Sequence, residues 1–163
     1  MTDTCEQALR RVVHNTMGDW QGLPPCNRET AERTFGPSPD GPDGAAAPGG
    51  RAMFFRNYSD PHDLAPHGVT VWFEADAAVA LQINSPALGA SPEAVFGQPE
   101  TKLRSDLAPT LQQWVYPERG LALHVHPRKD LAKRLYGFAP MTLAEYEESW
   151  LSRVAMRRIP LRR

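Results

Sequence analysis

The stretches RETAERTFG, residues 28–36, and SPEAVFG, residues 91–97, decide the predicted fold, because each is typical of a short helix that ends at a Phe-Gly pair. Glycine often ends a helix, since it adopts the left-handed conformation without strain. The same spacing then leads from each glycine to an apolar run, MFF at 53–55 and WVY at 114–116. A fixed offset of this kind indicates repeated structural units.

Further apolar runs extend the match between the two halves. We predict strands at 51–58, 69–74 and 79–84, and GVTV at 68–71 and ALQINSP at 80–86 have counterparts in GLAL at 120–123 and RLYGFAP at 134–140. The predicted fold class is therefore α+β. Two tandem helix-loop-βββ units form one antiparallel sheet, and N-terminal and C-terminal helices are added to it.

The length of 163 residues fits a single domain. We divide it into an N-terminal helix and entry (1–22), a first repeat unit (23–86), a second repeat unit (87–140) and a C-terminal helix and tail (141–163). The C-terminal helix has the clearest signals, a capping box from Thr142 to Glu145 and an apolar stripe through Leu143, Tyr146, Trp150 and Val154.

Two segments are predicted to lie outside the helices. Residues 37–50 are rich in proline and glycine, which predicts a mobile loop. The tail at 156–163 is predicted to add an edge strand, with Pro160 and the arginines discouraging further pairing.

Composition excludes several classes of function. Lys and Arg total 18 against 19 for Asp and Glu, so no overall charge attracts nucleic acid or an anionic membrane. The polar start and the lack of a long apolar run predict a cytoplasmic protein. Cys5 and Cys26 lie in no CxxC motif, so we expect unlinked thiols. The motifs of nucleotide-binding proteins and of common hydrolases are missing, and the sequence indicates no cofactor.

The pattern from RETAERTFG to VALQINSP, and again from SPEAVFG to RLYGFAP, resembles the tandem-repeat architecture of β-lactamase inhibitor proteins. It also resembles single-unit outer-membrane assembly lipoproteins of similar topology. The resemblance covers about residues 27–140 as a pattern and not as specific motifs. It implies a sheet face or loops presented to a protein partner. Members of these families are exported and the inhibitors carry disulfides, features that the sequence does not indicate here.

The sharpest local feature is the stretch LHVHP at 123–127. Side chains alternate along a strand, so His124 and His126 are predicted to lie on one face, opposite Leu123 and Val125. Two such histidines can begin a metal site, with a third ligand from Glu74, His62 or His67. The alternative is a pair of histidines at the surface or facing a partner.

Alternation brings further side chains to this predicted face: Trp72 and Glu74, with Tyr136 and Arg134 from a neighbouring strand. Aromatic and imidazole groups on a sheet face indicate a binding surface, although the terminal helix or the loop could also cover it.

Our leading hypothesis is a binding or accessory module that engages a protein or a small-molecule ligand through this face, with Trp72, Tyr136 and Arg134 as ligand-binding residues. The alternative is a small enzyme, with or without a metal, that uses no nucleotide. Its catalytic residues would be His124, His126 and Glu74.

Overall fold

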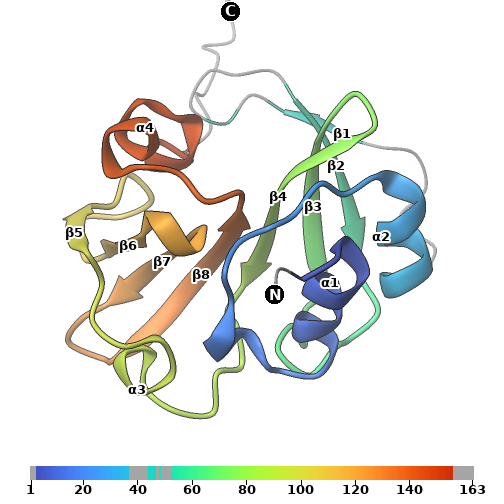
Figure 1. Cartoon of the computed structure of the whole chain (residues 1–163). Helices are drawn as coiled ribbons and strands as arrows, with labels where there is room; N and C mark the ends of the chain where they lie inside the picture. Colours follow the sequence, from blue (N-terminus) through green and yellow to red (C-terminus); the bar gives the residue numbers. More distant parts are fainter. Residues whose placement is uncertain (1–2, 37–43, 47, 49–52, 156–163) are drawn as a thin grey trace, which may run out of the picture.

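The computed structural model describes residues 3–36, 44–46, 48 and 53–155. Within them, one eight-stranded antiparallel sheet has the order β1-β2-β3-β4-β8-β7-β6-β5, and helices pack against it (Figure 1). The α+β class and the single antiparallel sheet are confirmed. The strands are β1 (Gly44–Ala46), β2 (Met53–Tyr58), β3 (Val69–Glu74), β4 (Ala77–Asn84), β5 (Thr101–Arg104), β6 (Gln112–Tyr116), β7 (Leu121–His126) and β8 (Leu131–Phe138).

The helices begin at side chains that cap their free backbone N–H groups. Asn27 accepts from the Thr30 amide at the start of α2, and Ser91 accepts from the Ala94 amide at the start of α3. The α-helices are α1 (Cys5–Val13), α2 (Arg28–Phe35), α3 (Pro92–Phe96) and α4 (Leu143–Glu148), and short 3₁₀ turns are η1 (Met17–Asp19), η2 (Pro117–Arg119) and η3 (Trp150–Ser152).

The sheet buries apolar side chains on both faces. Val69, Val71 and Phe73 belong to the layer shared with α1 and α2, and Trp72 belongs to the layer shared with α4 and η3. The predicted alternation along β3 is therefore confirmed. The face under α4 and η3 is the one predicted to carry the site.

The C-terminal helix is shorter than its apolar stripe predicts. The capping box between Thr142 and Glu145 is present, but α4 ends at Glu148 and the 3₁₀ turn η3 follows. Because the chain turns at Ser149, Trp150 and Val154 reach the sheet from outside the helix and are still buried against it. The prediction of one continuous helix is wrong, whereas the burial of its stripe is confirmed.

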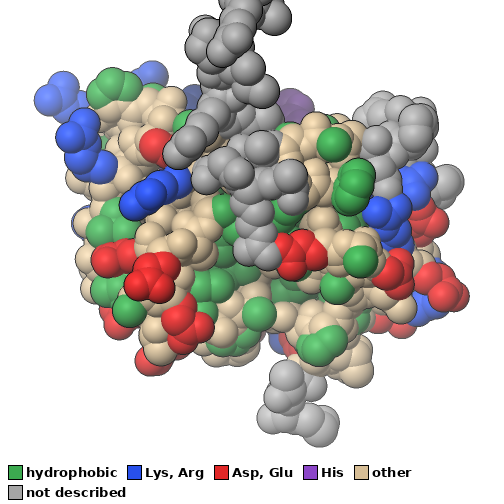
Figure 2. Space-filling view, turned by 90° about the horizontal axis from the view of Figure 1, so that it is seen from above, with side chains coloured by type: hydrophobic (Ala, Val, Ile, Leu, Met, Phe, Trp, Pro, Cys, Tyr) green, Lys and Arg blue, Asp and Glu red, His purple; other side chains and the backbone are tan. Residues whose placement is uncertain are grey.

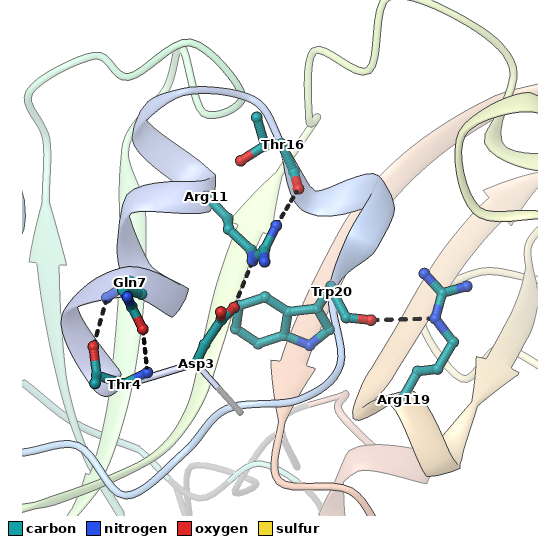
Figure 3. Close-up of polar contacts among 7 residues, drawn as sticks. All are labelled: Asp3, Thr4, Gln7, Arg11, Thr16, Trp20 and Arg119. Carbon is teal, nitrogen blue, oxygen red and sulfur yellow. Dashed lines mark hydrogen bonds and ion pairs between the residues drawn. The ribbon is translucent and has the colours of Figure 1, made fainter. Parts of the chain in front are cut away.

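The N-terminal segment is fixed to the far half of the sheet by Arg119 (Figure 3). The Arg119 guanidinium donates to the backbone carbonyl of Trp20 at 3.2 Å. It also donates to the carbonyls of Phe96 at 2.8 Å and of Gly18 at 2.7 Å. The Trp20 indole in turn donates to the carbonyl of Gly120 at 2.8 Å. The bonds of Arg119 to Trp20 and Gly18, and of Trp20 to Gly120, join segments about a hundred residues apart in sequence, so they fix the N-terminal segment to η2 and the residue that follows it.

Cys5 and Cys26 form a disulfide, with their Cα atoms 5.2 Å apart. The expectation of unlinked thiols is wrong, because the fold brings the start of α1 beside the residue that precedes the Asn27 cap. Disulfides are typical of oxidising compartments, so this bond does not support the cytoplasmic prediction. No helix among the described residues is long and apolar enough to cross a membrane.

Two short edge strands lie outside the predicted elements. β1 falls within the segment predicted as a loop at 37–50, and it pairs with β2. β5 pairs with β6 at the opposite edge. The rest of that loop, except Pro48, and the tail at 156–163 lie outside the described residues, so the predictions made for them stay predictions.

Candidate functional site

The structure brings four of the predicted site residues together on one face. Arg134 pairs with His124, and Tyr136 lies two residues along β8 on the same face. The rings of His124 and Tyr136 are 5.9 Å apart, and those of Trp72 and Tyr136 both contact Trp150, at 5.7 and 6.1 Å. Exposure is 4% for Trp72, 1% for Tyr136 and 0% for His124. Trp72 and Tyr136 therefore belong to a second core that includes Trp150 of η3, and His124 is buried beside Tyr136. No ligand reaches these three side chains without movement of the residues that cover them.

Glu74 and His126 lie away from that group. Glu74 pairs with Ala77 at the start of β4, whereas Arg134, opposite His124, pairs with Asn84 at the end of β4. Seven residues of strand span about 23 Å, so Glu74 cannot form an acid-base pair with His124.

His126 is the last residue of β7, two residues beyond His124, and it is not part of the buried group. It lines a separate pocket with Gln112 and Arg128. Its Nδ1 is buried without a hydrogen-bond partner in the described part of the chain. Among the residues that the structure describes, no three His, Cys, Asp or Glu side chains are grouped as a metal site.

His124 contacts a hydroxyl that the sequence reasoning did not connect with it. Its Nδ1 lies 2.7 Å from Ser105 Oγ, and Ser105 Oγ also accepts from the Leu107 amide. Burial, together with the nearby Arg134 charge, lowers the pKa of His124 to about 4. A base with so low a pKa takes a hydroxyl proton poorly near neutral pH. The pair therefore acts as a buried structural contact and is badly suited to activate Ser105 as a nucleophile.

A polar pocket opens on the same face, next to the second core. Its volume is about 280 Å³. A row of paired residues crosses β2, β3 and β4 at its floor: Asn57 faces Thr70, and Thr70 faces Gln82. Its described lining residues are Asn57, Tyr58, Ser59, His67, Gly68, Val69, Thr70, Gln82 and Asn84.

Hydrogen bonds orient the amides of this polar pocket. The Trp72 indole donates to Gln82 Oε1 at 2.9 Å, and Gln82 Nε2 donates to Asn84 Oδ1 at 3.1 Å. The Thr70 hydroxyl donates to Asn57 Oδ1 at 2.7 Å. The predicted ligand-binding residue Trp72 thus acts from beneath the pocket by positioning the amides that line it.

A second hollow is apolar. It has a volume of about 350 Å³ and lies between η3, the end of β8 and the Leu23–Pro25 segment. Phe138 and Trp150 are among its lining residues. Figure 2, seen from above, shows hydrophobic side chains near the middle of the molecule, with acidic side chains to either side. Nothing in the described residues indicates what would occupy this hollow.

The polar pocket was missed although the sequence carries a signal for it. Thr70 and Trp72 alternate on β3, as Gln82 and Asn84 do at the end of β4. Polar residues at every second position mark the face of a strand that the main core does not use. The missing information was the register, which places the polar ends of three strands side by side.

No protein-family model and no curated protein matches the chain. Among solved structures, the chain is similar to a DUF4309 family protein (YjgB) from Bacillus subtilis, with 13% sequence identity and a TM-score of 0.49. The match covers 83% of this chain and 97% of the other. It assigns no family to the chain, and the comparisons do not confirm the resemblance to β-lactamase inhibitor proteins.

Proposed function

We propose that the protein is a binding module that holds a small polar ligand in the polar pocket on β2, β3 and β4. The observation that carries this proposal is the row of Asn57, Thr70 and Gln82 across three strands, because these polar side chains line one pocket together. Polar side chains whose hydrogen-bonding directions are already fixed lose little entropy when a ligand binds. A few convergent polar groups in a concave site are typical of small-molecule recognition.

The enzyme hypothesis has less support. His124 is 0% exposed and its imidazole has a pKa of about 4, while Glu74 lies at the opposite end of β4 from the His124 row. No acid-base pair is therefore available to an accessible substrate in the arrangement that the sequence suggested.

We infer further that the sheet consists of two related units that meet where β4 pairs with β8. The supporting observations are the side-chain caps at Asn27 and Ser91, and the helix ends at Gly36 and Gly97, where φ is +87° and +79°. Each unit then includes an additional edge strand, β1 or β5. The polar pocket belongs to the first unit, whereas α4 and η3 cover the corresponding face of the second.

A thermal-shift screen tests the binding proposal. The probes are a mixed library of monosaccharides, amino acids, organic acids and sugar phosphates. Compounds that raise the melting temperature of the wild type are measured again with Asn84→Leu, which changes an exposed pocket residue, and with the control Gln21→Leu, which changes an exposed residue elsewhere. We expect the stabilisation to be lost in N84L and kept in Q21L. Compounds that stabilise all three proteins equally would place binding outside the pocket.

A further inference from the structure

The orientation of the Asn84 side-chain amide is fixed by a chain of two hydrogen bonds that begins at the Trp72 indole. An indole N–H only donates, so the hydrogen bond from Trp72 requires the oxygen of Gln82 to face the ring. The nitrogen of Gln82 must then face Asn84, and it donates to Asn84 Oδ1 at 3.1 Å. This bond engages the Asn84 oxygen and leaves the NH₂ group of the exposed Asn84 side chain to present its donors to the pocket.

A positive charge lies beside that amide. Arg134 pairs with Asn84 across β4 and β8, and its Nη1 donates to the Tyr136 hydroxyl at 3.1 Å. Burial raises the pKa of Tyr136 to about 12, so the phenol stays neutral and does not balance the guanidinium. The Asp106 carboxylate is near enough to act electrostatically on Tyr136. The ion pairs seen among the described residues, Arg10–Glu6, Arg11–Asp3, Arg33–Glu29 and Arg56–Glu32, do not include Arg134.

The pocket lining adds no negative charge. None of its described residues is an Asp or Glu, and His67 lies at its rim. A neutral sugar is usually held by acceptors for its hydroxyl protons and by an exposed aromatic ring. Here the nearest indole, Trp72, is 4% exposed, and the oxygens of Gln82 and Asn84 each already accept one hydrogen bond.

We propose that the polar pocket binds an oxyanion, a carboxylate or phosphate group of a small molecule, through the Asn84 amide that lines it and the guanidinium of Arg134, which pairs with Asn84 at the edge of the pocket and is not itself one of its lining residues. This inference rests on the proposed function, because it names the ligand chemistry of the same pocket. Arginine suits this role, since its planar fork of donors matches the oxygens of a carboxylate or phosphate and its charge strengthens each bond.

The indole N–H signals of the four tryptophans give an internal readout of binding by NMR. The Trp72 indole bonds to Gln82 at the pocket, whereas the Trp20 indole bonds to Gly120 on the opposite side of the sheet. The probes are inorganic phosphate, acetate and glucose, each titrated at constant ionic strength with sodium chloride. Phosphate and acetate separate the two sources of oxyanion, and glucose is the neutral control. We expect at least one anion to shift the Trp72 signal and leave the Trp20 signal in place, and glucose to shift neither.

Two arginine variants test the charge. Arg134→Gln should weaken binding of the active anion at least tenfold, while Arg33→Gln, the same change on α2 on the other face, should alter it less than twofold. Equal weakening in R134Q and R33Q would overturn the oxyanion site, because it would indicate attraction by net charge alone. A Trp72 shift with glucose and with neither anion would also overturn it while leaving the pocket a ligand site. If no compound in this titration moves the Trp72 signal and no compound in the library raises the melting temperature through the pocket, the proposed function fails as well.

Discussion

Replacing His124 with glutamine should remove a large part of the pH dependence of stability between pH 7 and pH 5. In the folded protein, burial lowers the pKa of this imidazole to about 4 from an ordinary value of 6.5. The unfolded chain therefore takes up the proton first as the pH falls, and acid favours unfolding. Stability from the neutral imidazole is complete above the unfolded pKa and is lost as the pH falls toward the folded pKa. Between pH 7 and pH 5 these values give a loss of about 2 kcal/mol.

Urea unfolding at several pH values measures this effect. The difference in unfolding free energy between wild type and His124→Gln should change by about 2 kcal/mol from pH 7 to pH 5. A second variant separates the causes: Ser105→Ala removes the hydroxyl at Nδ1 but leaves the imidazole buried, so it should keep the wild-type slope. Burial is the main cause of the shift, with the Arg134 charge second. An H124Q variant whose slope equals that of the wild type would refute the reasoning.

Three further predictions concern stability and use denaturant unfolding. Trp150→Ala should lower the unfolding free energy by about 3 to 5 kcal/mol, because the ring contacts the aromatic side chains of the second core; an unchanged midpoint would show that η3 is an exposed appendage. Cys5→Ala with Cys26→Ala should cost about 3 kcal/mol, the entropy of opening a loop of this size, and a reductant should reproduce that loss in the wild type alone. Gly120→Ala should lower the unfolding free energy by about 2 to 5 kcal/mol, because a Cβ there meets the Phe138 carbonyl. Gly89 also has a positive φ but has open space around it, so Gly89→Ala should lower the unfolding free energy by only about 1 kcal/mol.

Local sequence signals were sufficient for most of the fold. The Phe-Gly helix ends, the capping box at Thr142 and the alternation along residues 69–74 each depend on neighbours within a few positions. Contacts between residues that are distant in sequence have no such local signal. The disulfide depends on how α1 packs beside the α2 cap, and β1 and β5 are stabilised by pairing with β2 and β6 and not by their own composition.

The candidate site was harder to predict than the fold. Alternation correctly assigns Trp72, His124 and Tyr136 to one face, but it does not state whether another element covers that face. Here Trp150 packs on the rings of Trp72 and Tyr136, so residues predicted to touch a ligand are buried. Glu74 was grouped with His124 because strand order and register, which separate them, were not known.

The polar pocket and the second core are two parts of one sheet face, and the row of residues that joins them explains why the polar pocket lies where it does. Gln82 pairs with Tyr136 across β4 and β8. On the Tyr136 side, Trp150 covers the row and apolar contacts fill the space. On the Gln82 side, the row continues through Thr70 to the exposed Asn57, and its polar groups line a pocket instead. Polar side chains are costly to bury without partners and inexpensive to keep beside water. The same contrast places Arg134 at the boundary, held by Tyr136 on one side and paired with Asn84 on the other.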